Sequence, residues 1–206
     1  MDAIIFDIDG TLWDTTEICA KAWSEAIKDN APHPVTLTAD QLKGLFGKPM
    51  NVIFRAVFPE LSEAERERLS LICCEYEEEY LNREAPIFFD GVIDTIKRLS
   101  EKYPLYIVSN CQKGYIETFL DKSGLGSYIK DYMCYGDTLL PKSGTIKKLI
   151  ERNSITSPVY VGDTRGDEEA CREAEIPFIF ASYGFGEAEA PYKAIKSFSE
   201  LEKLFT

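Results

Sequence analysis

The sequence contains one histidine, His33, and no Cys-x-x-C pair. His33 stands in the segment NAPHPV, which predicts a loop, so it is a poor candidate for the oriented base of a Ser-His-Asp triad. The cysteines are spread along the chain, which favours reduced and mostly packed thiols over disulfides or a thiolate zinc site. They are Cys19, Cys73, Cys74, Cys111, Cys134 and Cys171. Long hydrophobic runs are also lacking, since none approaches the roughly 18–20 residues of a membrane-spanning helix.

Basic residues are scarce as well. The chain has 23 Lys and Arg against 35 Asp and Glu, a formal net charge of -12. Such a charge repels a nucleic-acid backbone on average, so we expect no nucleic-acid partner. Because the apolar runs are short, we expect no membrane partner either. The first ten residues, MDAIIFDIDG, contain three acids where a signal peptide needs a basic flank. We therefore expect a cytoplasmic protein, a monomer by default with a homodimer as the alternative.

Short apolar runs and helical patterns alternate along most of the chain. Of 206 residues, 45% are hydrophobic, enough for one domain or one domain with an insertion. The predicted strands are 3–6, 104–110, 131–136, 158–163 and 177–184. The predicted helices between and after them are 90–102, 113–122, 143–152, 166–174 and 197–205. Strands that alternate with helices of this length predict an α/β fold with a doubly wound parallel sheet.

Residues 14–84 break this alternation, because they contain no convincing strand. Helical patterns cover 15–28, 38–46, 50–58 and 62–81, and Ser62 with Glu65 matches a capping box. We therefore predict a catalytic core formed by 1–13 and 85–206, with 14–84 inserted as a small α-helical cap. The acidic run 75–79, with Glu84, is interpreted as a solvated helix face.

Unusual polar residues follow several of the predicted strands. They are Asp7, Asp9 and Thr11 after the first strand, Ser109 and Asn110 at the end of the second, Lys142 after the third, and Asp163 and Asp167 after the fourth. Each alone has a local explanation in a turn or a helix cap. Together, at one edge of a parallel sheet, four carboxylates require a cation, and oxygen ligands without His or Cys favour Mg²⁺. A metal beside an ammonium and a hydroxyl suits phosphoryl transfer.

The order of these motifs resembles the haloacid dehalogenase-like superfamily. The motifs are D-I-D-G-T from Asp7, Ser109-Asn110, Lys142, and G-D-T-R-G-D from Gly162. The resemblance covers essentially the whole chain and points to the phosphatase branch with a helical cap. The segments FDGV (89–92) and SYGFG (182–186) are most similar to members of the phosphoglycolate-phosphatase type.

The resemblance implies a role for each matching residue. Asp7 is expected to be the nucleophile that forms an aspartyl phosphate, and Asp9 the general acid and base, with its backbone carbonyl on the metal. Ser109 and Asn110 would hold the transferring phosphoryl group, and Lys142 would neutralise it. One departure concerns Lys142, because a proline precedes it instead of following it.

Further expectations concern the metal and the cap. Asp163 would bind Mg²⁺ directly, whereas Asp167 would act through a metal-bound water or orient Lys142. Thr11 would order the first loop beside the substrate, or serve only as a turn residue. Lys48, in the loop Gly47-Lys48-Pro49, would meet an anionic group remote from the phosphate, the alternative being a solvated lysine. Weaker candidates of the same kind are Arg55 and Arg165.

The implied activity is hydrolysis of small phosphomonoesters with Mg²⁺, phosphoglycolate being one candidate substrate. Asp9 argues against carbon–halogen cleavage, because dehalogenases lack an acid at that position. A sugar phosphomutase shares the chemistry of Asp7 and Asp9 and is the first alternative. A phosphate-binding or interaction protein without activity is the second, and the intact motif residues argue against it.

Overall fold

The computed structural model describes residues 1–205 and contains the expected parallel sheet. Its six strands lie in the order β5-β4-β1-β6-β7-β8, and all neighbours run parallel. They are β1 (Ala3–Phe6), β4 (Leu105–Ser109), β5 (Asp131–Cys134), β6 (Pro158–Gly162), β7 (Phe178–Ala181) and β8 (Lys193–Ile195). Every residue of β1, β4 and β6 is buried. The predicted fold class is confirmed.

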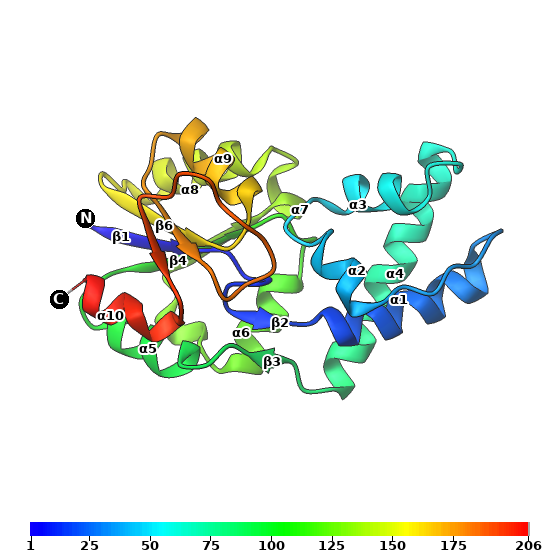
Figure 1. Ribbon diagram of the computed structural model, residues 1–206, viewed down its shortest axis with the longest axis horizontal. Coiled ribbons are helices and arrows are strands. Elements are labelled where there is room, and N and C mark those ends of the chain that lie inside the picture. Colours follow the sequence, from blue (N-terminus) through cyan, green and yellow to red (C-terminus); the bar gives the residue numbers. More distant parts are fainter. Residues whose placement is uncertain (206) are drawn as a thin grey trace.

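Helices cover both faces of the sheet, because alternate residues of a strand point to opposite sides. Ile4 and Phe6 pack with residues of α5, α6 and α10, whereas Ala3 and Ile5 pack with residues of α8 and α9. These helices are α5 (Val92–Ser100), α6 (Tyr115–Ser123), α8 (Lys142–Asn153), α9 (Arg165–Ala174) and α10 (Leu201–Leu204). Figure 1 shows α8 and α9 on one side of the sheet and α5 and α10 on the other.

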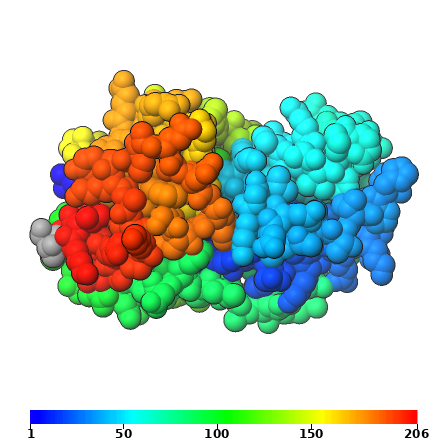
Figure 2. All heavy atoms as spheres, viewed as in Figure 1, coloured from blue at the N-terminus to red at the C-terminus, as the bar shows by residue number. Residues whose placement is uncertain are grey.

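Four helices lie beside the sheet instead of on it (Figure 1). They are α1 (Thr16–Asn30), α2 (Ala39–Lys43), α3 (Met50–Val57) and α4 (Glu63–Arg83). They share a separate buried cluster that includes Trp23 and Phe54. The predicted capping box of Ser62 and Glu65 is present at the start of α4. Figure 2 shows the four helices, in blue and cyan, as a lobe next to the larger one.

Several short elements differ from the prediction. A two-stranded antiparallel ribbon, β2 (Trp13–Asp14) with β3 (Ile87–Phe88), joins the chain where it leaves and re-enters the larger lobe. A strand of two residues is too short to show the alternation of apolar and polar residues by which strands are predicted. The strand predicted for 131–136 ends at Cys134, and α7 (Tyr135–Thr138) follows it directly. The helix predicted for 197–205 begins as a 3₁₀ turn, Phe198–Glu200. Another 3₁₀ turn covers Gly126–Tyr128.

The cysteines and the single histidine differ in their exposure to solvent. Five of the six cysteines are buried, with Cys74 half-buried. His33 is exposed in the segment between α1 and α2. Among residues 1–205, the helices are too short or too polar to cross a bilayer.

Candidate active site

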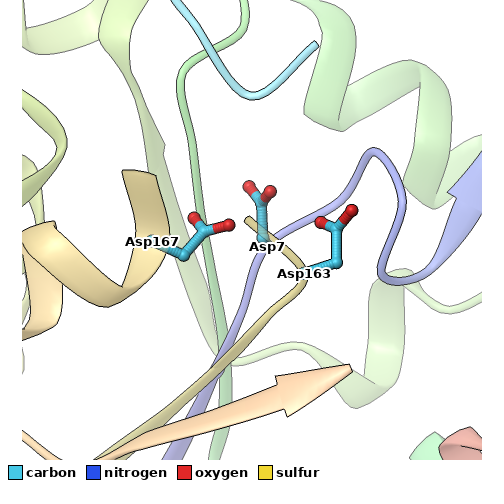
Figure 3. Close-up of side chains that lie close together, drawn as sticks. All are labelled: Asp7, Asp163 and Asp167. Carbon is cyan, nitrogen blue, oxygen red and sulfur yellow. The ribbon is translucent and has the colours of Figure 1, made fainter. Parts of the chain in front are cut away.

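Three carboxylates converge beyond the carboxyl ends of β1 and β6. Asp7 follows β1, Asp163 follows β6, and Asp167 lies in the first turn of α9. Because β1 and β6 are paired, the amide of Asp7 donates to the carbonyl of Val161 at 2.9 Å, which sets the two strand ends side by side. Figure 3 shows the three side chains directed into one space. One oxygen from each lies within 4.8 Å of the others.

Asp7 is 1% exposed, and Lys142 is its charged neighbour. Lys142 Nζ lies 3.0 Å from Asp7 Oδ1, while Oδ2 has no hydrogen-bond partner among residues 1–205. Burial raises the pKa of Asp7 to about 6, although the charge of Lys142 opposes the shift. Burial lowers the pKa of Lys142, but the charges of Asp167 and Asp7 outweigh it and raise that pKa above its ordinary value. Lys142 therefore stays an ammonium, and Asp7 keeps an oxygen available to a ligand.

Asp163 accepts hydrogen bonds from two segments that are distant in sequence. Its Oδ1 accepts from the Thr11 hydroxyl at 3.2 Å, and its Oδ2 accepts from the amide of Phe185 at 2.7 Å. Gly10, at φ +81°, passes so close that a Cβ there would lie 2.1 Å from Asp163 Oδ2. Burial raises the pKa of Asp163, and the charges of Asp167 and Asp7 add to the effect. Thr11 therefore lies at the site, where its hydroxyl donates a hydrogen bond to the Asp163 carboxylate.

Both oxygens of Asp167 have partners in the protein. Oδ1 lies 2.5 Å from Lys142 Nζ, and Oδ2 accepts from the amide and hydroxyl of Thr164 at 3.0 and 2.6 Å. The second pair belongs to the capping box that begins α9. The ion pair with Lys142 fits the expected orienting role of Asp167.

Asp9 turns its carboxylate toward a different set of groups. Its Oδ1 accepts from the Tyr115 hydroxyl at 2.6 Å, from Trp13 Nε1 at 3.1 Å and from the Thr15 hydroxyl at 3.3 Å. Burial raises the pKa of Asp9 to about 7, opposed by the Tyr115 hydrogen bond and increased by the charges of Asp7 and Glu77. At neutral pH this carboxyl can therefore both give and take a proton.

The cluster fits a hard divalent cation. All its side-chain donors are carboxylate oxygens, and no His or Cys belongs to it. The buried Asp7 oxygen without a partner is an atom that a cation would satisfy. A cation would also lower the pKa values that burial has raised, since it favours the charged carboxylates. Mg²⁺ suits this donor set.

A cavity of about 30 Å³ lies between this edge of the sheet and helices α1 to α4. Asp9, Ser109, Asn110 and Lys48 are among its lining residues. Asn110 Nδ2 donates to the carbonyl of Gly47 at 2.7 Å, which ties the larger lobe to the loop between α2 and α3. The cavity holds about two water molecules, so it admits only a small group in this conformation.

Three basic side chains were candidates for contact with an anionic group of the substrate, and they lie in different places. Lys48 lines the cavity but is exposed, and its Nζ donates to Gly44 O at 3.4 Å. Arg55 pairs with an exposed Glu63, and Arg165 pairs with Glu169 and Glu189, so neither is brought to the cavity.

Three polar residues of the cavity, Glu77, Gln112 and Tyr115, are absent from the set predicted from the sequence. Glu77 belongs to the run predicted as a solvated face; Glu75 is exposed as predicted, but Glu77 is 2% exposed. A signal was present, because residues 69, 73, 77 and 81 follow one another at helical spacing and the other three are Leu or Cys. Tyr115 and Gln112 follow the Ser-Asn motif, but no pattern separates them from ordinary helix-start residues.

Comparison with known proteins gives sequence relatives along most of the chain. A family model described as haloacid dehalogenase-like hydrolase matches residues 4–181. A phosphoglycolate phosphatase of Agrobacterium fabrum is 30% identical over 192 residues, which cover 88% of this chain and 80% of that protein. One of Xanthomonas campestris is 28% identical over 189 residues, which cover 89% and 84%.

Solved structures with the same fold cover the whole chain. A predicted phosphoglycolate phosphatase from Haemophilus somnus 129PT has a TM-score of 0.88 at 19% identity, over 100% of this chain and 98% of that one. A haloacid dehalogenase-like family hydrolase from Streptococcus pneumoniae has a TM-score of 0.81 at 23% identity, over 100% and 99%. At these identities the likeness shows the fold alone.

Proposed function

The chain belongs to the haloacid dehalogenase-like hydrolase family, and from that premise we propose that it is a Mg²⁺-dependent phosphatase that hydrolyses small phosphomonoesters through an aspartyl phosphate. The resemblance predicted from the four motifs is thereby confirmed. One observation carries the proposal: the buried Asp7 carboxylate has an oxygen without a protein partner, beside the ammonium of Lys142 and two further carboxylates. The phosphoglycolate phosphatases among the relatives support it.

In the first step, a carboxylate oxygen of Asp7 attacks the phosphorus of the substrate. The bond between phosphorus and the ester oxygen breaks, and its electron pair stays on that oxygen. Asp9 gives its proton to the leaving oxygen, a transfer that its raised pKa favours. The products are the free alcohol and a phosphoryl group bound to Asp7.

In the second step, Asp9 as a carboxylate removes a proton from water, and the water oxygen attacks phosphorus. The bond between phosphorus and Asp7 breaks, so inorganic phosphate leaves and both carboxyls return to their starting states. Tyr115, which donates to Asp9 at 2.6 Å, positions that carboxyl in both steps. Lys142 neutralises charge on the transferring group, and Ser109 with Asn110 binds its oxygens.

Mg²⁺ held by Asp7, Asp163 and the backbone carbonyl of Asp9 would supply positive charge that draws the phosphate dianion to an acidic site. Asp167 orients Lys142 in this arrangement. Thr11 acts on the site through Asp163, to which its hydroxyl donates. Asp7 and Asp163 would thus serve as ligands, and Lys142, the one buried lysine among residues 1–205, as a counter-charge.

Residues 14–84 would act as a cap that closes over the substrate. Supporting this, the hydrogen bond from Asn110 to Gly47 crosses between the lobes beside the cavity. Lys48 stands at the exposed edge of the same cavity, where its charge would attract an anionic substrate. The ribbon of β2 and β3 provides the two chain crossings about which the lobes would move.

The test is release of inorganic phosphate from a panel of metabolite monophosphates with Mg²⁺. We expect steady turnover on several small phosphomonoesters, with a phosphoryl group on Asp7 trapped by acid quench. A phosphomutase would instead convert sugar phosphates without net phosphate release. Phosphate binding without turnover on any substrate would identify a non-catalytic binding protein and refute the proposal.

A further inference from the structure

The wall of the cavity that faces Asp9 carries a buried carboxyl from the cap. Glu77 of α4 is 2% exposed and lines the same cavity as Asp9. None of the catalytic steps above uses it. Burying a carboxyl costs free energy unless hydrogen bonds or charges compensate it, so the partners of Glu77 decide what it can bind.

Glu77 is held from both lobes. Its Oε2 accepts from Trp23 Nε1 at 2.7 Å, and its Oε1 accepts from Gln112 Nε2 at 2.7 Å. Trp23 lies on α1 of the cap, and Gln112 follows β4 in the larger lobe. Each carboxylate oxygen can accept more than one hydrogen bond, so Glu77 retains acceptor capacity toward the cavity that it lines.

The charges around the cavity favour one kind of leaving group. Within residues 1–205, its charged lining residues are Asp9, Glu77 and Lys48. Lys48 is exposed and donates to Gly44, whereas both acids are buried. The ammonium of Lys142 is engaged by Asp7 and Asp167 and does not line this cavity. A substrate carboxylate in this space would therefore face two buried acids without a buried cation.

We propose that Glu77 is a specificity-determining residue, which favours phosphomonoesters whose leaving group carries a hydrogen-bond donor, a hydroxyl or an ammonium, over those that carry a carboxylate. The donor would bind Glu77 while the ester oxygen lies near Asp9. This inference rests on the phosphatase function proposed above. It departs from the phosphoglycolate phosphatases among the relatives, because phosphoglycolate bears a carboxylate.

Four two-carbon phosphomonoesters test the proposal, since they differ only at the end of the leaving group. Ethyl phosphate is the reference, and 2-hydroxyethyl phosphate, phosphoethanolamine and phosphoglycolate add a hydroxyl, an ammonium and a carboxylate. We expect wild-type kcat/KM for the hydroxyl or the ammonium ester to exceed that for phosphoglycolate by about tenfold or more, the effect of one charge-assisted hydrogen bond. Whichever of the two leads identifies the donor.

The assays are run at pH 8, above the pKa of about 7 to which burial raises Glu77, so that this carboxyl is ionised. Under these conditions Glu77→Gln keeps the shape of the side chain and removes its charge. It should raise the ratio of kcat/KM for phosphoglycolate over ethyl phosphate by about tenfold and lower the ratio for phosphoethanolamine. Glu78→Gln is the matched control, because Glu78 is the next residue of α4 and is exposed. Its ratios should equal those of the wild type.

The wild-type ranking decides the matter even if Glu77→Gln does not fold. The inference would be overturned if ethyl phosphate is turned over and kcat/KM for phosphoglycolate equals or exceeds that for both the hydroxyl and the ammonium ester. The phosphatase function would still stand. Unchanged ratios in a folded Glu77→Gln would overturn it too. No turnover of any of the four esters with Mg²⁺ would refute the phosphatase function, and the inference would fall with it.

Discussion

Replacing Glu77 by Gln should make the protein more resistant to unfolding at high pH, and the effect should fade in acid. Burial raises the pKa of Glu77 from 4.5 to about 7, although hydrogen bonds from Gln112 and Trp23 oppose the shift. The folded state therefore favours the protonated carboxyl. Its contribution to stability is fully present below pH 4.5, the value in the unfolded chain, and is lost as the pH rises through about 7.

The size of the effect follows from the shift. A difference of about 2.5 pH units corresponds to about 3 kcal/mol of unfolding free energy, at about 1.4 kcal/mol per unit. The titratable groups that interact with Glu77 are three thiols, one phenol and one carboxyl: Cys19, Cys73, Cys74, Tyr115 and Asp9. Burial raises the pKa of the thiols and of the phenol, so they stay neutral in this range, whereas burial and, in addition, the charge of Glu77 raise the pKa of Asp9. The difference between variant and wild type therefore measures Glu77 together with its coupling to Asp9.

Urea unfolding measures this difference. Wild type, Glu77→Gln and the control Glu78→Gln are titrated at intervals from pH 4 to pH 8 without divalent metal. Tryptophan fluorescence and circular dichroism should give one coincident transition before free energies are compared. The stability of Glu77→Gln relative to the wild type should rise by about 3 kcal/mol over this range, and that of Glu78→Gln should stay flat.

Two results would refute this reasoning. Parallel pH profiles for wild type and Glu77→Gln would mean that Glu77 is ionised in the folded state across the range. A variant that loses stability relative to the wild type as the pH rises would mean that the charged carboxylate is the favoured form. In either case Glu77 would have a stronger counter-charge than the structure contains.

Three further predictions concern the carboxylate cluster. Asp7→Asn should lower phosphate release by more than about a hundredfold with little change in the thermal unfolding midpoint; residual activity above about a hundredth would remove Asp7 from the nucleophile role. Excess EDTA should abolish activity, Mg²⁺ should restore it and Ca²⁺ should inhibit, because Ca²⁺ binds carboxylates in looser geometry and can occupy both oxygens of Asp7; full activity in EDTA would exclude the metal. Gly10→Ala should lower both stability and activity, because its Cβ would lie 2.1 Å from Asp163 Oδ2. Gly124→Ala is the control: Gly124 has φ +67° but no atom near its Cβ position, so the change should lower stability by only about 1 kcal/mol and keep activity. Equal effects of the two substitutions would contradict this account.

The sheet and the polar residues at its edge could be predicted from local patterns in the sequence. Apolar runs such as 3–6 and 158–163, which end in turn residues, favour buried strands, and in a parallel sheet their carboxyl ends share one edge. This is why Asp7 and Asp163 were predicted to meet, and they do. The capping pattern of Ser62 and Glu65 was readable because its partners lie three residues apart.

Which polar groups of other elements face the site depends on how the helices and strands pack together. Four of the five residues 75–79 are glutamates, yet packing of α4 against α1 buries Glu77 and leaves Glu75 in solvent. Tyr115 reaches Asp9 across 106 residues of sequence, and Gln112 reaches Glu77 across 35. Local patterns carry no record of such distant partners, because burial and pKa depend on where the lobes meet.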